Sequence, residues 1–117
     1  VMLRTLLGFG IGAERRAGYT GVWVANAKIG FIGVRLALGF TMHGFSLNVN
    51  NDLSPFTSIA PCGIQGIRVT SMRELSGVTV DEEKAREMAA RYYSEVFQIQ
   101  MTAVTMDVVT RQIYAED

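Results

Sequence analysis

The sequence predicts a single domain that mixes α-helix and β-strand. Residues 27–38 and 41–49 both alternate with a period of two, which is typical of strands. Gly39 and Phe40 lie between the two runs, so we expect a β-hairpin. Residues 82–97 instead place their apolar side chains at helical spacing, and Asp81 precedes them as a candidate N-cap.

Shorter elements are expected on either side of these three. They are a helix over residues 1–16 that frays at its glycines, a strand at 21–24, a helix that starts at Asp52 with Pro55 in its first turn, and a short strand at 67–69 within a loop. Residues 98–117 fit either an edge strand or a tail without fixed structure. We therefore divide the chain into a main domain at 1–97 and an extension at 98–117.

Composition narrows the classes of function. The chain has 117 residues, of which 49% are hydrophobic and 19% charged, as expected for one small globular domain. Eleven basic and eleven acidic residues balance, so no net field favours nucleic acid or an anionic membrane as a partner. No apolar stretch approaches the roughly 20 residues of a spanning helix, and the first residues do not resemble a signal peptide.

Three side chains are candidates for chemistry. Cys62, the single cysteine, lies between Pro61 and Gly63, so it is expected on a turn, where a thiol can face a cleft. A small buried hydrophobe is the simpler interpretation of a lone cysteine. Lys28 opens a strand whose following same-face residues are apolar, although a strand-end lysine that reaches water is the simpler interpretation. His43 lies on an apolar face, which favours a satisfied structural histidine.

Other chemistry has less support. One cysteine and one histidine do not supply a zinc ligand set, so no metal is expected. A single cysteine cannot form an internal disulfide, which fits a reducing compartment such as the cytoplasm. Asn48 and Thr70 could donate hydrogen bonds to the site, but capping or sheet-edge bonds are the simpler role.

Five segments, taken together with their order and spacing, resemble the lipoyl(octanoyl) transferases, also called lipoate-protein ligases B. They are residues 21–24 (GVWV), 27–35 (AKIGFIGVR), 43–49 (HGFSLNV), 52–56 (DLSPF) and 59–63 (IAPCG). The resemblance extends from about residue 1 to the helix that is expected to end near 97. It implies an α/β fold with a mixed sheet flanked by helices, as in the biotin and lipoate protein ligases.

The resemblance also implies the site. Cys62 matches the thiol that carries the acyl group in this family, and Lys28 matches the lysine that activates it. The segments that match the substrate pocket are Phe31, Ile32 and Gly33 in one strand and Gly44, Phe45 and Ser46 in the other. His43 is assigned a positioning role. Phe31 stands where the family usually has Ser, which places the shape of the acyl tunnel in question.

The implied reaction moves an octanoyl group from octanoyl–acyl-carrier protein to a lysine of a lipoyl domain, without a cofactor. The expected acceptors are the lipoyl domains of 2-oxoacid dehydrogenases and the glycine cleavage H protein. Two family segments, Arg-Gly-Gly and His-Gly-Pro-Gly-Gln, do not occur here, and Val1 lies in a helical pattern. We therefore expect the C-terminal part of such an enzyme, incomplete at its N-terminus and weakly active or inactive alone.

Two alternatives remain open at this point. The first is an ATP-dependent lipoate or biotin ligase, which shares the fold but needs no thiol nucleophile. The second is an inactive fragment that binds acyl-carrier protein or a lipoyl domain without turnover, with Arg35, Arg68 and Arg73 as candidate contacts to an acidic partner.

Overall fold

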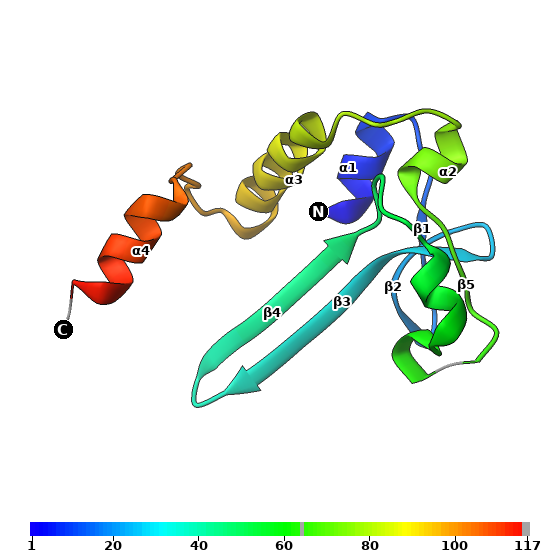
Figure 1. Ribbon diagram of the computed structural model, residues 1–117, viewed down its shortest axis with the longest axis horizontal. Helices are drawn as coiled ribbons and strands as arrows, with labels where there is room; N and C mark the ends of the chain where they lie inside the picture. Colours follow the sequence, from blue (N-terminus) through cyan, green and yellow to red (C-terminus); the bar gives the residue numbers. More distant parts are fainter. Residues whose placement is uncertain (64, 116–117) are drawn as a thin grey trace.

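A long antiparallel β-hairpin is the largest feature of the computed structural model (Figure 1). Strands β3 (Ala27–Ala37) and β4 (Phe40–Leu47) pair in continuous register from Gly30↔Leu47 to Ala37↔Phe40. The two turn residues, Leu38 and Gly39, have φ angles of 52° and 82°. Positive φ at both central residues is the turn geometry that matches the twist of two-residue hairpins. The predicted hairpin is confirmed, but its turn is one residue earlier than expected, at Leu38 and Gly39, and β4 begins at Phe40 and ends at Leu47.

The hairpin belongs to a mixed sheet of five strands. The structure describes residues 1–63 and 65–115, with the side chain of Cys62 excepted. Along the sheet, β1 (Glu14–Arg16), β2 (Tyr19–Val24), β3 and β4 are antiparallel neighbours, and β5 (Arg68–Val69) pairs with the start of β3 in parallel. The predicted mixed sheet with flanking helices is therefore confirmed, as are the strands expected at 21–24 and 67–69.

The first helix is shorter than predicted. Helix α1 covers Met2–Gly8, and the expectation of helix as far as residue 16 is wrong because β1 begins at Glu14. The glycines end the helix. Gly10 has a φ of 76°, and the amide of Ile11 donates to the carbonyl of Leu6 at 2.9 Å, which closes the turn that leaves α1.

Two further helices follow the sheet. Helix α3 (Glu82–Phe97) is confirmed with its predicted cap, since the carboxylate of Asp81 accepts from the backbone amide of Lys84 at 3.1 Å. Helix α2 (Met72–Ser76) was not predicted. It is capped by Ser71, whose hydroxyl accepts from the amide of Glu74 at 3.1 Å.

Residues 98–117 contain a helix, α4 (Met106–Tyr114), so the expectation of an edge strand or an unstructured tail is wrong. Figure 1 shows α4 away from the sheet, beyond the end of α3. Among the described residues, no helix is long and apolar enough to cross a membrane.

The hydrophobic core lies at one end of the hairpin. Met2 and Leu6 of α1 meet Val22 of β2, Ile29 of β3 and Met72 of α2, and α1 also packs beside α3 (Figure 1). The far half of the hairpin leaves this core, and its apolar side chains are exposed, for example Leu36 at 71% and Phe40 at 74%. The radius of gyration, 16.2 Å, accordingly exceeds the roughly 13 Å expected of a compact chain of this length.

Two glycines of β3 test where along the hairpin the hydrophobic core ends. A methyl group at Gly30 would lie 2.6 Å from the sulfur of Met2 and 3.3 Å from Cβ of Val22, whereas a methyl group at Gly33 meets no atom within 4 Å. We expect Gly30→Ala to lower the free energy of unfolding by about 1–3 kcal/mol through overpacking. Gly33→Ala, in the same strand, should change it by less than about 0.5 kcal/mol.

The measurement is urea unfolding followed by the fluorescence of Trp23, which is 2% exposed. Equal unfolding midpoints for the two variants would contradict the placement of the core at the start of β3.

Candidate functional site

Lys28 is buried inside the sheet. Its side chain is 1% exposed, and the strand that carries it lies between β2 and β5. Its carbonyl accepts from the amide of Thr70 at 2.9 Å, which joins β5 to this point of β3. The simpler interpretation, a strand-end lysine that reaches water, is therefore wrong. A buried lysine needs compensating contacts, because taking an ammonium group out of water is costly.

Aromatic rings supply part of this compensation. The ammonium nitrogen of Lys28 lies 4.8 Å from the ring centre of Phe31 and 5.6 Å from that of Trp23. Both distances are within the range of cation–π attraction. The guanidinium of Arg16, in the neighbouring strand β1, also lies 4.9 Å from the ring centre of Trp23. The lysine is thus held in a setting that suits a positive charge.

Gly21 makes room for the lysine side chain. Its φ is 98°, a conformation that glycine adopts without steric cost. A methyl group built there would meet the carbonyl oxygen of Gly30 and would lie 2.6 Å from Cε of Lys28. No pattern in the sequence marks this role, because the contact joins two strands.

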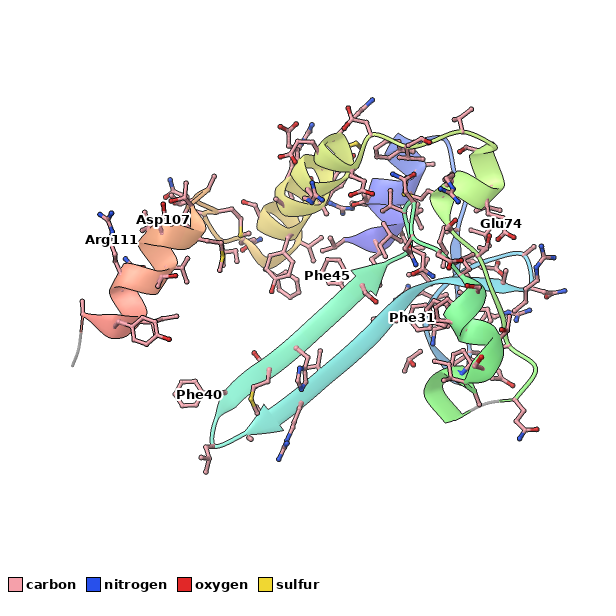
Figure 2. The ribbon with its side chains drawn as sticks, in the orientation of Figure 1. Phe31, Phe40, Phe45, Glu74, Asp107 and Arg111 are labelled. Carbon is pink, nitrogen blue, oxygen red and sulfur yellow. The ribbon has the colours of Figure 1, made fainter. Side chains whose placement is uncertain are left out.

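The segment that carries Cys62 contacts β3 on both sides of Lys28. It contains the 3-10 helices η1 (Ser54–Ser58) and η2 (Pro61–Gly63) and leads into β5. From η1, the ring of Phe56 stacks on Phe31 at 5.5 Å with an interplanar angle of 10°. At the other end, β5 pairs with Ala27 and Lys28. Figures 1 and 2 show this segment beside the first part of β3, with Phe31 facing it.

The backbone of Cys62 lies in η2, as the predicted turn requires. Its side chain lies outside the described part of the structure, so its role as nucleophile stays a prediction. The amide of Gly63 donates to the carbonyl of Ala60 at 3.0 Å. That amide is therefore engaged within the turn.

The helix expected from Asp52 is the 3-10 helix η1, which begins after Leu53. The carboxylate of Asp52 still organises this start, since it accepts from the amide of Ser54 at 2.9 Å and from its hydroxyl at 2.6 Å. These two bonds, with a smaller contribution from the positive charge of Arg73, lower the pKa of Asp52 from its usual value of 3.8.

Asn48 and Thr70 have structural roles, as the simpler interpretation had it. The side-chain amide of Asn48 donates to the carbonyl of Thr70 at 3.1 Å, and the hydroxyl of Thr70 donates to Glu74 at 2.6 Å. Both residues are buried. They fix β5 against the end of β4 and so hold the Cys62 segment at its C-terminal end.

The residues predicted to form the substrate pocket surround one hollow of about 420 Å³. It is lined by Phe31, Ile32, Gly33, His43, Gly44, Phe45 and Ser46. They meet because β3 and β4 pair at Phe31↔Ser46, Ile32↔Phe45 and Gly33↔Gly44. The binding of a substrate in this hollow remains a prediction.

A second hollow, of about 550 Å³, lies between α1, the end of β4 and α3. Phe45 and Ser46 line both hollows, and Phe45 also stacks against Tyr93 of α3 at 6.5 Å. The end of β4 thus separates the two spaces. Nothing in the sequence pattern indicated the second one.

His43 differs from the expected structural histidine. Its side chain is exposed, and among the described residues it makes no hydrogen bond. Its φ is 71°, an uncommon value for a residue with a side chain, and Gly44 follows with a φ of 150°. The backbone is therefore strained at the rim of the hollow.

A mixed sheet with flanking helices is the arrangement expected of a lipoyl ligase catalytic domain. Residues 1–94 match the family described as the lipoyl protein ligase A/B catalytic domain, so the chain belongs to this family.

Three of its curated relatives are named octanoyltransferases. An octanoyltransferase of Thermoanaerobacter sp. (strain X514) is 43% identical over 91% of this chain and 46% of its own length. A chloroplastic octanoyltransferase of Arabidopsis thaliana is 41% identical over 91% of this chain and 41% of its own length. An octanoyltransferase of Aromatoleum aromaticum is 52% identical over 59% of this chain and 30% of its own length. The chain thus spans less than half the length of these relatives.

The packing of Gly21 on Lys28 can be tested with a matched glycine. Gly18 also has a positive φ, 79°, but a methyl group there meets no atom within 4 Å. We expect Gly18→Ala to cost about 1 kcal/mol of stability from backbone strain alone. Gly21→Ala should cost about 1–3 kcal/mol more and should displace Lys28.

Displacement is measured by mass spectrometry after labelling with an amine-reactive ester, because the chain has only two lysines. Lys84, on the surface of α3, serves as the internal reference. Faster labelling of Lys28 in Gly21→Ala, but not in Gly18→Ala, is the expected result. Equal labelling in the two variants would show that Gly21 does not hold the lysine in place.

Proposed function

We propose that this chain forms part of an octanoyltransferase that moves an octanoyl group from octanoyl–acyl-carrier protein to a lysine of a lipoyl domain. In this proposal Cys62 carries the acyl group as a thioester, Lys28 activates it, and no cofactor is required. The membership of the lipoyl ligase family and the printed names of the relatives support the reaction class. The observation that carries the proposal is the burial of Lys28 beneath the segment that contains Cys62.

A lysine ammonium can activate a cysteine by stabilising its thiolate. The nucleophile in acyl transfer is the thiolate, and a free thiol with a pKa of about 8.5 is only a few per cent ionised at neutral pH. An ammonium at about 4 Å contributes up to roughly 4 kcal/mol in favour of the thiolate at an intermediate dielectric, before desolvation costs. Only about 2 kcal/mol is needed to ionise roughly half of the thiol at pH 7.

The first step exchanges one thioester for another. The thiolate of Cys62 attacks the carbonyl carbon of the octanoyl thioester, and the bond from that carbon to the carrier's sulfur breaks. The departing thiolate takes up a proton, for which the ammonium of Lys28 is the donor. Octanoyl-Cys62 and the free carrier thiol result, and because both acyl groups are thioesters this step is nearly balanced.

The second step forms an amide. The amine of the acceptor lysine attacks the octanoyl-Cys62 carbonyl, the carbon–sulfur bond breaks, and the neutral amine of Lys28 takes the proton that the nucleophile loses. An amide is more stable than a thioester, so this step drives the transfer forward. The acyl group arrives already activated, which is why no ATP is consumed.

The hollow lined by Phe31, whose ring contacts the ammonium of Lys28, is the proposed site for the acyl chain. Its lining is mostly apolar, and Gly33 and Gly44, which pair in register, have no side chains to fill it. His43, at the rim, is proposed to position the substrate and not to exchange protons.

The proposed acceptors are the lipoyl domains of 2-oxoacid dehydrogenases and the glycine cleavage H protein, and the proposed compartment is the cytoplasm. The name of the Arabidopsis relative places that protein in the chloroplast. Of the alternatives, an ATP-dependent ligase gives no role to Cys62. A non-catalytic fragment that only binds acyl-carrier protein or a lipoyl domain is distinguished by whether it forms an acyl-enzyme.

The proposal is tested by intact mass after mixing the chain with octanoyl–acyl-carrier protein. We expect one octanoyl adduct that hydroxylamine removes, absent from Cys62→Ser. Lys28→Met should slow adduct formation by about 10- to 30-fold at pH 7, because the thiolate fraction falls. Subsequent addition of a lipoyl domain should move the octanoyl group to that protein without ATP.

The lysine on the surface of α3 provides the matched control. Lys84→Met removes the same charge at an exposed position, and adduct formation should be unchanged. An adduct that persists in Cys62→Ser, or a requirement for ATP, would refute the thioester mechanism. A folded chain that forms no adduct would show either that the first step needs the family segments absent from this chain or that the chain is a binding fragment. Repeating the assay with a longer chain that carries those segments decides between the two.

A further inference from the structure

We propose that Phe31 and Phe56 form an aromatic clamp that positions the ammonium of Lys28 against the segment carrying Cys62. This inference rests on the proposed function, since it gives Phe31 a role in activating the thiol. Phe31 then acts through Lys28 and is a positioning residue, in addition to its place in the lining of the hollow.

The first observation is the contact between ring and cation. The ammonium nitrogen of Lys28 is 4.8 Å from the ring centre of Phe31, nearer than the 5.6 Å that separates it from Trp23. Attraction between a cation and a ring is strongest where water is excluded. Lys28 is 1% exposed, so its contact with the ring is of the stronger kind.

The second observation is that the ring of Phe31 is itself held. Phe56 stacks on it with centres 5.5 Å apart and planes within 10° of parallel. Offset stacking of this kind stabilises one ring orientation. A side chain fixed in this way can hold a cation in a defined place, whereas a mobile ring would follow it.

The third observation is where the two rings come from. Phe31 lies in β3, three residues after Lys28, and Phe56 lies in η1, six residues before Cys62. Their stacking therefore joins the strand that bears the lysine to the segment that bears the cysteine. The backbone pairing of β5 with β3 joins the same segment at its other end. The aromatic contact and the strand pairing together restrain both ends of the segment that carries Cys62 relative to Lys28.

The test measures thiolate formation directly. Cys62 is the single cysteine, so the rate of alkylation by iodoacetamide as a function of pH reports its ionisation alone. We expect Phe31→Leu and Phe56→Leu each to raise the midpoint of this profile by roughly 0.5–1 pH unit, because the ammonium is less firmly held. Phe31→Tyr retains the ring and should keep the midpoint of the original chain.

Phe40→Leu is the matched control. Phe40 lies at the far end of the hairpin, with its ring exposed (Figure 2), and its replacement should leave the midpoint unchanged. Folding of every variant is checked by the emission of the buried Trp23.

A second series repeats Phe31→Leu in a Lys28→Met background. If Phe31 acts through the lysine, the replacement should cause no further shift once the lysine is gone. The clamp would be overturned if Phe31→Leu shifted the midpoint equally with and without Lys28. It would also be overturned if Lys28→Met raised the midpoint and Phe31→Leu left it unchanged. An unchanged midpoint in Lys28→Met itself would refute the proposed activation of Cys62, and the clamp with it.

Discussion

The burial of one ammonium group is the constraint on which the rest of this architecture depends. Lys28 is removed from water inside the sheet, and a charge in that position is tolerated only if its surroundings compensate for lost hydration. The rings of Trp23 and Phe31 lie next to its ammonium group. Gly21 leaves room for its side chain, and β5 pairs with its backbone. These neighbouring elements pack around the lysine, and their arrangement accommodates its side chain.

Much of the secondary structure could be predicted because the signals are local. The hairpin follows from alternation and a two-residue turn, and α3 follows from helical spacing behind an Asp cap. Helix α2 was not predicted, although Ser71 and Glu74 have the spacing of a capping box, because its five residues are too few to show a helical period. In α4, Met106, Val109 and Ile113 repeat at helical spacing. The strand preference of valine concealed that pattern.

The candidate site could be predicted only in part. The residues of the hollow were assigned from the resemblance to a known family, and the pairing of β3 with β4 brings them together. The burial of Lys28 could not be predicted, since it depends on β5, which returns from far along the chain. Strict alternation would also place Lys28 and Phe31 on opposite faces of β3. In the pairing of β2 with β3, the register shifts between Val22 and Trp23. The ladder is irregular there, and the ring of Phe31 comes close to the ammonium of Lys28.

The parallel pairing of β5 with β3 has a consequence for the order of folding. The β3–β4 hairpin joins residues that are close in sequence, and such hairpins form within about 1–10 μs. The pairing of β5 closes a loop that contains β4 and both 3-10 helices, and long loops close late because of their entropic cost. Lys28 therefore stays hydrated through the early events. The nascent chain does not bear the electrostatic cost of burying it until the Cys62 segment docks.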